Sequence, residues 1–244
     1  LDYTARAAEA LGENEDNLRY RRQAEEVRNA FHQAFYDPTH HTYSDAGSNI
    51  YALRMGVPDE CRKDVIATLR HEIMERNNGH INTGFLATKY FFETLTDNGL
   101  GDVAYTAMNQ RDFPSYGWWL AQGATVTWEQ WDGGNSHNHP MFGSGLTWFY
   151  RRLAGIEADE LHPGYRRFFL RPYLHKGHER THYAKQTPYG NVAVDIQQQA
   201  NAYTYRVSIP VGSTGIAVRP TANANAITES GKPLSQAKGV TVLR

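Results

Sequence analysis

Residues 114–143 read PSYGWWLAQGATVTWEQWDGGNSHNHPMFG, and their composition differs from that of the rest of the chain. All five tryptophans lie between Trp118 and Trp148, and six glycines gather between Gly117 and Gly145. Two carboxylates, Glu129 and Asp132, belong to the same stretch. Tryptophans also gather in ordinary protein cores, because each indole ring buries a large area. The stretch therefore indicates either a packed core or a loop-rich aromatic pocket with a carboxylate at its centre.

A carbohydrate would suit such a pocket. Sugar rings have apolar faces that stack on indole rings, and hydroxyl groups that need Asn, His and carboxylate partners. Glycosidic bonds are cut by carboxylates, which act as a general acid together with either a base or a nucleophile. The stretch supplies each of these residue types, so we treat it as a candidate carbohydrate site.

Outward from this stretch, residues 1 to about 156 show the apolar spacing of three and four residues that is typical of helices. The helix expected at 17–36 carries Leu18, Val27 and Phe35 on its apolar positions, and the one at 83–96 has few charges, so more of its surface should be buried. The other helices are expected at about 49–55, from 58 to about 77, at 100–110 and at 142–154. The chain starts at Leu1, inside a helical-looking segment, and we expect it to be part of a longer protein.

After about Pro163 the pattern changes to short strands. They are expected at 168–174, 182–185, 192–198, 203–209 and 216–218. Val192, Val194 and Ile196 alternate with polar or small residues, which is the period of a half-buried strand. Several short strands at this spacing are typical of a β-sandwich.

Composition narrows the classes of partner. The 244 residues carry a formal net charge of -1, so no overall field draws the chain to nucleic acid or to an anionic membrane. No apolar run approaches the ~20 residues of a membrane span. The single cysteine, Cys61, excludes an internal disulfide framework and a cysteine-based zinc site. We therefore expect a neutral partner, and we predict no cofactor and no bound metal.

Two ordered strings in the central stretch, 123–132 (GATVTWEQWD) and 135–143 (NSHNHPMFG), resemble signatures of the bacterial α-L-rhamnosidases of glycoside hydrolase family 78. The segments 79–84, 114–117 and 187–190 are similar to that family too, so the resemblance covers essentially the whole chain. The combination of Trp-Glu-x-Trp with His-Asn-His is specific. The resemblance implies a multi-domain α and β protein. Residues 1–160 would form part of an (α/α)6 toroid and residues 161–244 a C-terminal antiparallel β-sandwich.

The resemblance also implies an inverting hydrolase that releases L-rhamnose from glycosides. Glu129 stands where the family has its general base, and His139 where a histidine contacts the sugar. The residues that would help to line the pocket are Trp118, Trp119, Trp128 and Trp131.

Several nearby residues have two possible roles. Asp132 could orient Glu129 or contact a sugar hydroxyl, or it could cap a loop at the surface. His80 and Asn82 could line the pocket, whereas Asn82 or Thr83 would equally serve as an N-cap. His137 and His139 have the spacing of metal ligands, but two histidines without a third ligand indicate hydrogen-bond partners instead.

In one respect the chain departs from the family. The family's general acid is a glutamate in an upstream motif that this chain lacks, and about eight helices are expected here against the twelve of a full toroid. We therefore expect the C-terminal part of a larger enzyme. Its partners would be the N-terminal part of the same protein and a rhamnose-containing glycoside or oligosaccharide, and self-association is possible. The open flanks should leave Phe85, Leu86, Phe91 and Phe92 with less cover.

Two other functions remain open at this point. Another toroid glycosidase or a polysaccharide lyase would share the architecture, but a lyase needs a basic cleft and only Arg111 lies near the stretch 114–145. A non-catalytic carbohydrate-binding protein would keep the aromatic residues and one carboxylate. The compartment, cytoplasm or periplasm, also remains open.

Overall fold

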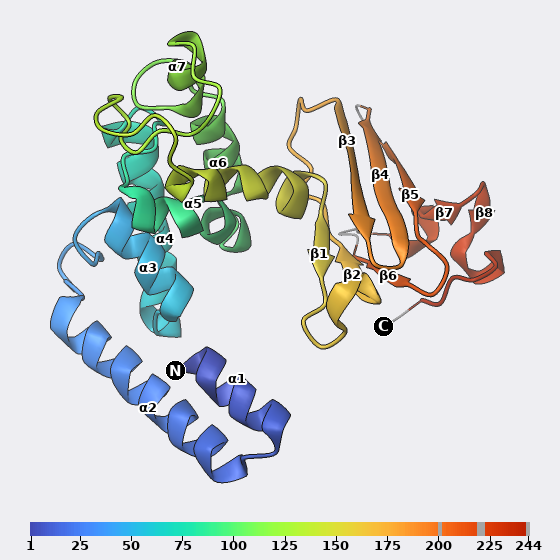
Figure 1. Cartoon of the computed structure of the whole chain (residues 1–244), viewed down its shortest axis with the longest axis horizontal. Coiled ribbons are helices and arrows are strands. Elements are labelled where there is room, and N and C mark those ends of the chain that lie inside the picture. The colour runs from blue at the N-terminus through green and yellow to red at the C-terminus, as the bar shows by residue number, and fades with distance from the viewer. Residues whose placement is uncertain (200–201, 219–222, 243–244) are drawn as a thin grey trace.

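The computed structural model describes residues 1–199, 202–218 and 223–242, with a helical part followed by a part made of strands (Figure 1). The helices are α1 (Asp2–Leu11), α2 (Asn14–Phe35), α3 (Ala46–Met55), α4 (Asp59–His71, continued by a π turn at Glu72–Arg76), α5 (Phe85–Asp97), α6 (Gly101–Met108) and α7 (Tyr116–Ala121). A last helix has 3-10 geometry at Met141–Leu146 and π geometry at Phe149–Leu153. The expected helices are thus present with ends shifted by a few residues, and α7 adds a helix to the stretch expected to be rich in loops.

Helix α5 forms the centre of the helical part. It packs against α3 and against the 3-10 helix Met141–Leu146, and its few charges are explained by burial on more than one side. Phe91 and Phe92 are fully buried, and the ring of Phe92 meets the buried ring of Trp148. The expectation that these two residues lose cover is therefore wrong, whereas Phe85 and Leu86 are indeed exposed.

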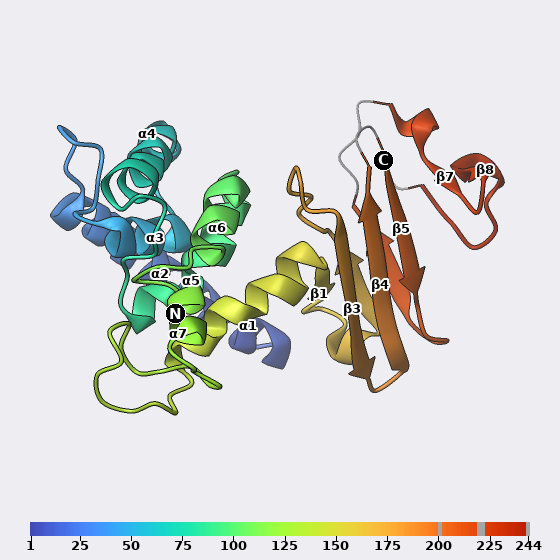
Figure 2. The same cartoon turned by 90° about the horizontal axis from the view of Figure 1, so that it is seen from above.

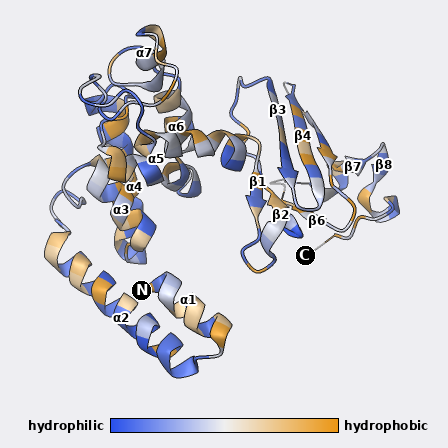
Figure 3. Ribbon diagram, in the orientation of Figure 1, coloured by the Kyte–Doolittle hydropathy of each residue, from blue (hydrophilic) through white to orange (hydrophobic). Residues whose placement is uncertain are grey.

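The antiparallel pair α1–α2 packs mainly on itself, at the lower end of the view in Figure 1. Leu18, Val27 and Phe35, which occupy the apolar positions of α2, are 64%, 54% and 60% exposed. Figure 3 shows apolar residues on both helices of this pair. Because α1 covers only one side of α2, just one residue of α2, Ala24, is buried.

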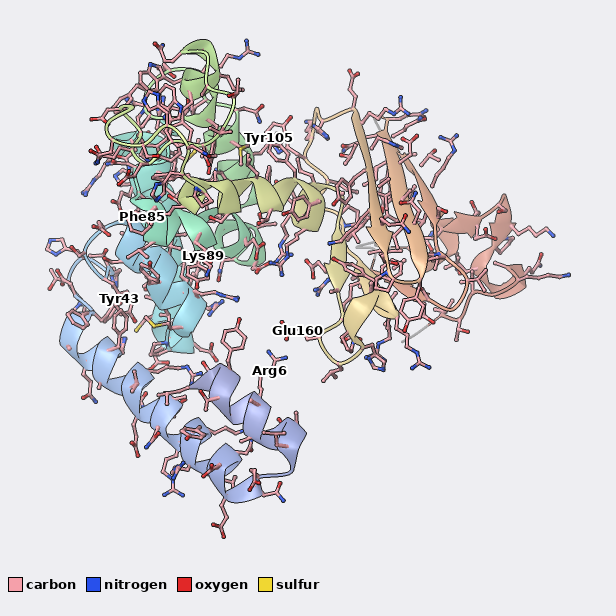
Figure 4. The ribbon with its side chains drawn as sticks, in the orientation of Figure 1. Arg6, Tyr43, Phe85, Lys89, Tyr105 and Glu160 are labelled. Carbon is pink, nitrogen blue, oxygen red and sulfur yellow. The ribbon has the colours of Figure 1, made fainter. Side chains whose placement is uncertain are left out.

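Few side chains tie the α1–α2 pair to the rest of the chain. The guanidinium of Arg28 donates to the carbonyl of Met55 at 2.8 Å, and the ring of Phe31 stacks on that of Tyr43. Arg6 of α1 forms an ion pair with Glu160 of the β part, and Figure 4 shows these two side chains pointing toward each other. These contacts are mostly exposed, so they stabilise the placement of the pair only modestly.

The strands form a β-sandwich. One sheet has the order β1-β2-β6 and the other β3-β4-β5, and Figure 2 shows β3, β4 and β5 side by side. Val192 and Val194 of β4 share a core with Phe168 and Leu170 of β2, so the two sheets pack face to face. The strands are β1 (Ile156–Ala158), β2 (Arg167–Leu170), β3 (Arg180–Thr187), β4 (Gly190–Gln198), β5 (Tyr203–Ser208) and β6 (Thr214–Ala217), followed by a small hairpin, β7 (Thr228–Glu229) and β8 (Lys232–Pro233). Short 3-10 turns lie at Pro163–Tyr165, Ala224–Ala226 and Leu234–Gln236.

The five predicted strands are present, and the expected alternation of β4 is confirmed, since Val192, Val194 and Ile196 are buried. The β2–β6 pair runs parallel, in contrast to all the other pairs among the described strands. The division of the chain at residues 160 and 161 stays a prediction. Strand β1 lies before that division and already pairs with β2.

The helical part and the sandwich meet at α6. The ring of Tyr105 stacks on His175 with 3.7 Å between centroids, and its hydroxyl lies 3.2 Å from Nδ1 of His178. The backbone of Gly101 lies so close to the ring of Tyr173 that a Cβ atom at this position would come within 2.3 Å of the ring. Within the described residues, no helix is both long and apolar enough to cross a membrane.

Candidate active site

The loop 122–140 rests on two tryptophans that hold it to the helices. The indole rings of Trp119 and Trp131 stack with 4.5 Å between centroids, and the indole N–H of Trp119 donates to the carbonyl of Trp131 at 2.8 Å. The indole N–H of Trp131 donates to the carbonyl of Thr83 at 3.0 Å, just before α5. Tyr116 and Phe142 pack against the same pair. Trp119 and Trp131 therefore form the floor below the loop.

Local hydrogen bonds place this floor. The hydroxyl of Ser115 caps α7 by accepting the N–H of Trp118 at 2.9 Å, which suits the N-cap preference of serine. The hydroxyl of Tyr116 donates to the carbonyl of Phe142 at 2.6 Å. Helix α7 and the last helix are thus tied together on both sides of the loop.

Above the floor the chain doubles back on itself. The N–H of His139 donates to the carbonyl of Thr127 at 2.8 Å, and the N–H of Glu129 donates to the carbonyl of Ser136 at 2.9 Å. The turn between them contains Gly133, whose φ of 84° favours glycine. We call residues 127–129 together with 136–139 the ribbon.

Glu129 and His139 lie together on one face of the ribbon. Oε2 of Glu129 accepts the N–H of Ser136 at 3.1 Å, and Nδ1 of His139 lies 3.6 Å from the same oxygen. The side chains of Glu129 and His139 are 34% and 25% exposed, so solvent reaches both of them. Among the described residues Oε1 of Glu129 has no hydrogen-bond partner. The arrangement fixes one carboxylate oxygen and leaves the other available to a water molecule.

Trp128 and His137 form a second pair of contacting side chains on the ribbon. Their rings stack with 4.2 Å between centroids and 10° between planes, and Nε2 of His137 lies 2.7 Å from the carbonyl oxygen of Gly133. Trp128 also contacts Trp119 below it and Trp118 beside it. Trp128 and His137 thus form one pair of contacting side chains on the ribbon, and Glu129 and His139 form another.

A cleft of about 520 Å³ opens beside Trp128, between the end of α7 and the ribbon. We call it the tryptophan cleft. Glu129, His139, Trp119 and Trp131 do not belong to its lining. Its walls are formed by Trp118, Gln122, Gly123, Ala124, Thr125, Val126, Trp128, Asp132, Gly133 and His137. Of the residues predicted to line one common pocket around Glu129, the structure brings Trp118, Trp128 and Asp132 together here, whereas Glu129 itself is not among the lining residues.

Asp132 and His80 have other partners as well. Oδ1 of Asp132 accepts the N–H of Gly134 at 3.0 Å, which is the loop-capping role left open by the sequence. Nε2 of His80 lies 2.8 Å from Oδ1 of Asp112, and this hydrogen bond lowers the pKa of the Asp112 carboxyl. His80 also lies 3.0 Å from the carbonyl oxygen of Asn77, so the contacts of its side chain are with the segments before α5 and α7.

The expected N-cap at Asn82 or Thr83 is wrong. Helix α5 begins at Phe85 with Gly84 as its N-cap, and no side chain caps it. The hydroxyl of Thr83 lies 2.8 Å from that of Thr88 instead, and both threonines are buried. Within the described residues, no group of three or more His, Cys, Asp or Glu side chains is placed to hold a metal ion.

Sequence reasoning missed two functional contacts. Ser136 acts through its backbone N–H, which any residue other than proline supplies, so its side chain gives no signal. His137 was considered only as a ligand or hydrogen-bond partner, whereas its ring covers Trp128.

A second hollow, of about 750 Å³, lies between the end of α2 and helix α4. Phe35, Asp37, His40, Glu72 and Arg76 are among its lining residues, and no tryptophan is. Burial raises the pKa of Glu72, although the N–H of Ala46, which donates to this carboxylate at 2.8 Å, opposes the shift. Nδ1 of His40 lies 2.6 Å from Oδ2 of Asp37, within hydrogen-bond distance.

Known proteins resemble the chain over almost all of its length. The model of the bacterial alpha-L-rhamnosidase 6 hairpin glycosidase domain matches residues 1–153, and that of the bacterial alpha-L-rhamnosidase C-terminal domain matches residues 155–233. An alpha-L-rhamnosidase of Streptomyces avermitilis is 34% identical over 87% of the chain, and one of Formosa agariphila is 27% identical over 99%. The chain spans only 22% and 27% of these two relatives.

Solved structures agree. The alpha-L-rhamnosidase from Dictyoglumus thermophilum superposes with a TM-score of 0.86 and 32% identity, over 96% of this chain and 27% of that one. The Streptomyces avermitilis alpha-L-rhamnosidase complexed with L-rhamnose gives a TM-score of 0.79 and 29% identity, over 94% and 24%. The expected fold, a partial (α/α)6 toroid followed by a C-terminal β-sandwich, is confirmed.

Proposed function

The chain belongs to the bacterial α-L-rhamnosidase family, and from this premise we propose that it is the C-terminal part of an enzyme that releases terminal L-rhamnose from α-L-rhamnosides. Support comes from the two family models, which match consecutive parts of the chain, and from relatives about four times as long. The rhamnose-containing glycoside is the proposed substrate, and the N-terminal part of the same protein completes the catalytic domain.

The observation that carries the proposal is the environment of Glu129. A general base must be ionised, held in place and open to the water that it activates. The N–H of Ser136 holds Oε2, and Oε1 is left for water. We propose that Glu129 takes a proton from this water as it attacks the anomeric carbon from the side opposite the leaving oxygen, which inverts the configuration. Nδ1 of His139, 3.6 Å from Oε2, would orient the carboxylate and bind a sugar hydroxyl.

We further propose that the general acid lies outside residues 1–244. In inverting glycosidases the two carboxyl groups are about 6.5–9.5 Å apart, with the water between one of them and the sugar. Asp132, the other carboxylate of the stretch, lines the tryptophan cleft, of which Glu129 is not part, and accepts the N–H of Gly134. It is therefore poorly placed to protonate the leaving oxygen of a sugar bound beside Glu129.

The tryptophans take different parts in this proposal. Trp119 and Trp131 support the ribbon from below through their stacked rings and their indole N–H groups. Trp128 positions the ribbon through its contacts with the rings of Trp119 and His137. His80 is proposed to order the segment before α5 rather than to contact the rhamnose that leaves.

The test uses the full-length enzyme and 4-nitrophenyl α-L-rhamnopyranoside. We expect hydrolysis, and proton NMR of the earliest product should show β-L-rhamnose before mutarotation. Initial release of the α-anomer would mean that Glu129 acts as a nucleophile or has no direct part in the reaction. Absence of any hydrolysis of α-L-rhamnosides would overturn the proposed activity and favour a protein that only binds carbohydrate.

A further inference from the structure

Thr127 holds His139 through two hydrogen bonds. The backbone carbonyl of Thr127 accepts the N–H of His139 at 2.8 Å, and the hydroxyl of Thr127 donates to the carbonyl of His139 at 2.5 Å. We propose that this hydroxyl is a positioning group of the active site, which fixes the backbone of His139 and through it the imidazole beside Glu129. The inference rests on the proposed function, in which Glu129 is the base and His139 orients its carboxylate.

The imidazole of His139 is held loosely by its own contacts. Its Nδ1 atom lies 3.6 Å from Oε2 of Glu129, which is beyond the usual length of a hydrogen bond, and the side chain is 25% exposed. Among the described residues this imidazole has no other hydrogen-bond partner and stacks on no other ring. The position of the ring therefore depends on the backbone that carries it.

The backbone of His139 is restrained from both ends. Because Pro140 follows it, the helical conformation is disfavoured at His139, and the next residue has no N–H to donate. The last helix begins directly afterwards, at Met141. The Thr127 hydroxyl lies near this helix as well, since a Cβ atom at Gly143 would be 3.9 Å from it. His139 is thus the joint between the ribbon and the last helix, and Thr127 fixes both of its backbone polar groups.

The hydroxyl contributes what the backbone alone cannot. The carbonyl of residue 127 would accept the N–H of His139 whatever side chain stood there, whereas the donor to the carbonyl of His139 comes from the side chain. Thr127 is half-buried, so water competes less for this hydrogen bond than it would at the exposed Thr125. Removal of the hydroxyl would leave the carbonyl of His139 without a partner in the described structure, and the chain would shift to satisfy it.

The experiment compares full-length variants in the hydrolysis of 4-nitrophenyl α-L-rhamnopyranoside. Thr127→Val removes the hydroxyl and keeps the branched shape of the side chain. We expect kcat/KM to fall by about 10–100-fold, because a displacement on the order of 1 Å in a positioned group can cost this much. The melting temperature should change little. Thr127→Ser keeps the hydroxyl and should retain most of the activity.

Two further variants separate a positioning role from a merely structural one. Thr125→Val is the matched control, because the Thr125 hydroxyl makes no hydrogen bond within the described residues, and it should hydrolyse the glycoside like the wild type. The double variant Thr127→Val/His139→Ala tests the route. If Thr127 acts through His139, the double variant should be about as active as His139→Ala alone, whereas independent losses would multiply.

A crystal structure of full-length Thr127→Val gives a readout that does not depend on turnover. We expect the imidazole of His139 to be displaced from Oε2 of Glu129 relative to the wild type, and to keep its place in Thr127→Ser. An imidazole that stays in place in Thr127→Val would contradict the positioning role.

Three kinetic outcomes would overturn the inference. They are near wild-type kcat/KM in Thr127→Val, activity of Thr127→Ser as low as that of Thr127→Val, and losses that multiply in the double variant. Failure of the proposed function looks different, because the wild type would then hydrolyse no α-L-rhamnoside. In that case the crystal structure of Thr127→Val decides the inference, which a displaced imidazole supports and an unmoved one rejects.

Discussion

At the scale of single residues, adjacent positions of the ribbon have unlike environments. Glu129 receives a backbone N–H and remains accessible, while its neighbour Trp128 is 7% exposed between His137 and Trp119. The importance of Glu129 and His139 could be predicted from the ordered motif. The position of each tryptophan could not be predicted, because its burial depends on which helices pack beneath the loop. Trp119 and Trp131, for example, lie below the loop and hold it to the helices.

The first prediction concerns the carboxylate. Glu129→Gln keeps the size of the side chain and its acceptor for the N–H of Ser136, but an amide takes up no proton from water. We expect kcat of the full-length enzyme on an aryl rhamnoside to fall by about 10²–10⁴, the usual contribution of general acid–base catalysis. The melting temperature should change little. Near wild-type turnover by this variant would exclude Glu129 as the base, and Gln130→Ala is the matched control.

At the scale of elements, close contacts fix the last helix against α5 and α7. Gly145 lies where a Cβ atom would come within 2.2 Å of the Tyr116 hydroxyl and 2.9 Å of a ring carbon of Phe92. Period and turn residues were sufficient to predict α4, α5 and the strand β4. They could not predict β1, since three residues are too short to show a period, and they could not predict that α1 covers α2 on only one side.

The second prediction follows from this contact. Gly145→Ala should lower the free energy of unfolding by about 1–3 kcal/mol, the usual cost of overpacking, because the added methyl displaces Tyr116 from the carbonyl of Phe142. Gly143→Ala in the same 3-10 helix is the control, since its Cβ would meet only Thr127, at 3.9 Å. Thermal unfolding of the two full-length variants compares them. Equal melting temperatures would show that the helix can shift away without cost.

The third prediction uses the carboxyl at the end of α4. Burial raises the pKa of Glu72 above its ordinary value of 4.5, with a further increase from Asp45, against the opposing effects of the Ala46 N–H and Arg76. The folded state therefore binds the proton more tightly than the unfolded state, and stability is lost as the pH rises from about 4.5 through the raised pKa. Glu72→Gln removes this loss and still accepts the N–H of Ala46 through its amide oxygen.

The melting temperatures of the wild type and Glu72→Gln are to be compared at pH 4 and pH 7. The variant should gain stability relative to the wild type as the pH rises between these values. Glu75→Gln, an exposed glutamate of the same turn, reports the effect of removing one charge there. A gain by Glu72→Gln that is the same at both pH values would contradict the assigned pKa shift.

At the scale of the whole molecule, several apolar residues of α1 and α2 are exposed to solvent. Leu11 of α1 is 78% exposed, and Leu18, Val27 and Phe35 of α2 are more than half exposed. The sequence predicted open flanks with less cover at Phe85, Leu86, Phe91 and Phe92, and of these Phe85 and Leu86 are exposed whereas Phe91 and Phe92 are buried. Helix α5 lies between α3 and the last helix instead, so the open flank is on the α1–α2 pair.

The fourth prediction concerns residues 1–244 produced alone. Each large apolar side chain left in water loses about 1.5–3 kcal/mol relative to burial, and a few such losses are comparable with a domain's stability of about 5–15 kcal/mol. We expect the isolated chain to self-associate or aggregate, and to hydrolyse no rhamnoside. Sedimentation velocity measures this. A monodisperse monomer of 27.7 kDa with a cooperative melt would show that the pair needs no further cover.

The stacking of Tyr105 on His175, and of Tyr173 over Gly101, has a consequence for how the protein responds to heat. The segment 171–178 belongs to the sandwich side of the chain, yet its rings complete the surface of α6. Melting of the sandwich would pull these rings away and leave α6 bare, while melting of α6 would leave the rings without a support. The two parts should therefore unfold in a single calorimetric transition. A truncation that removes the sandwich should also destabilise the helical part.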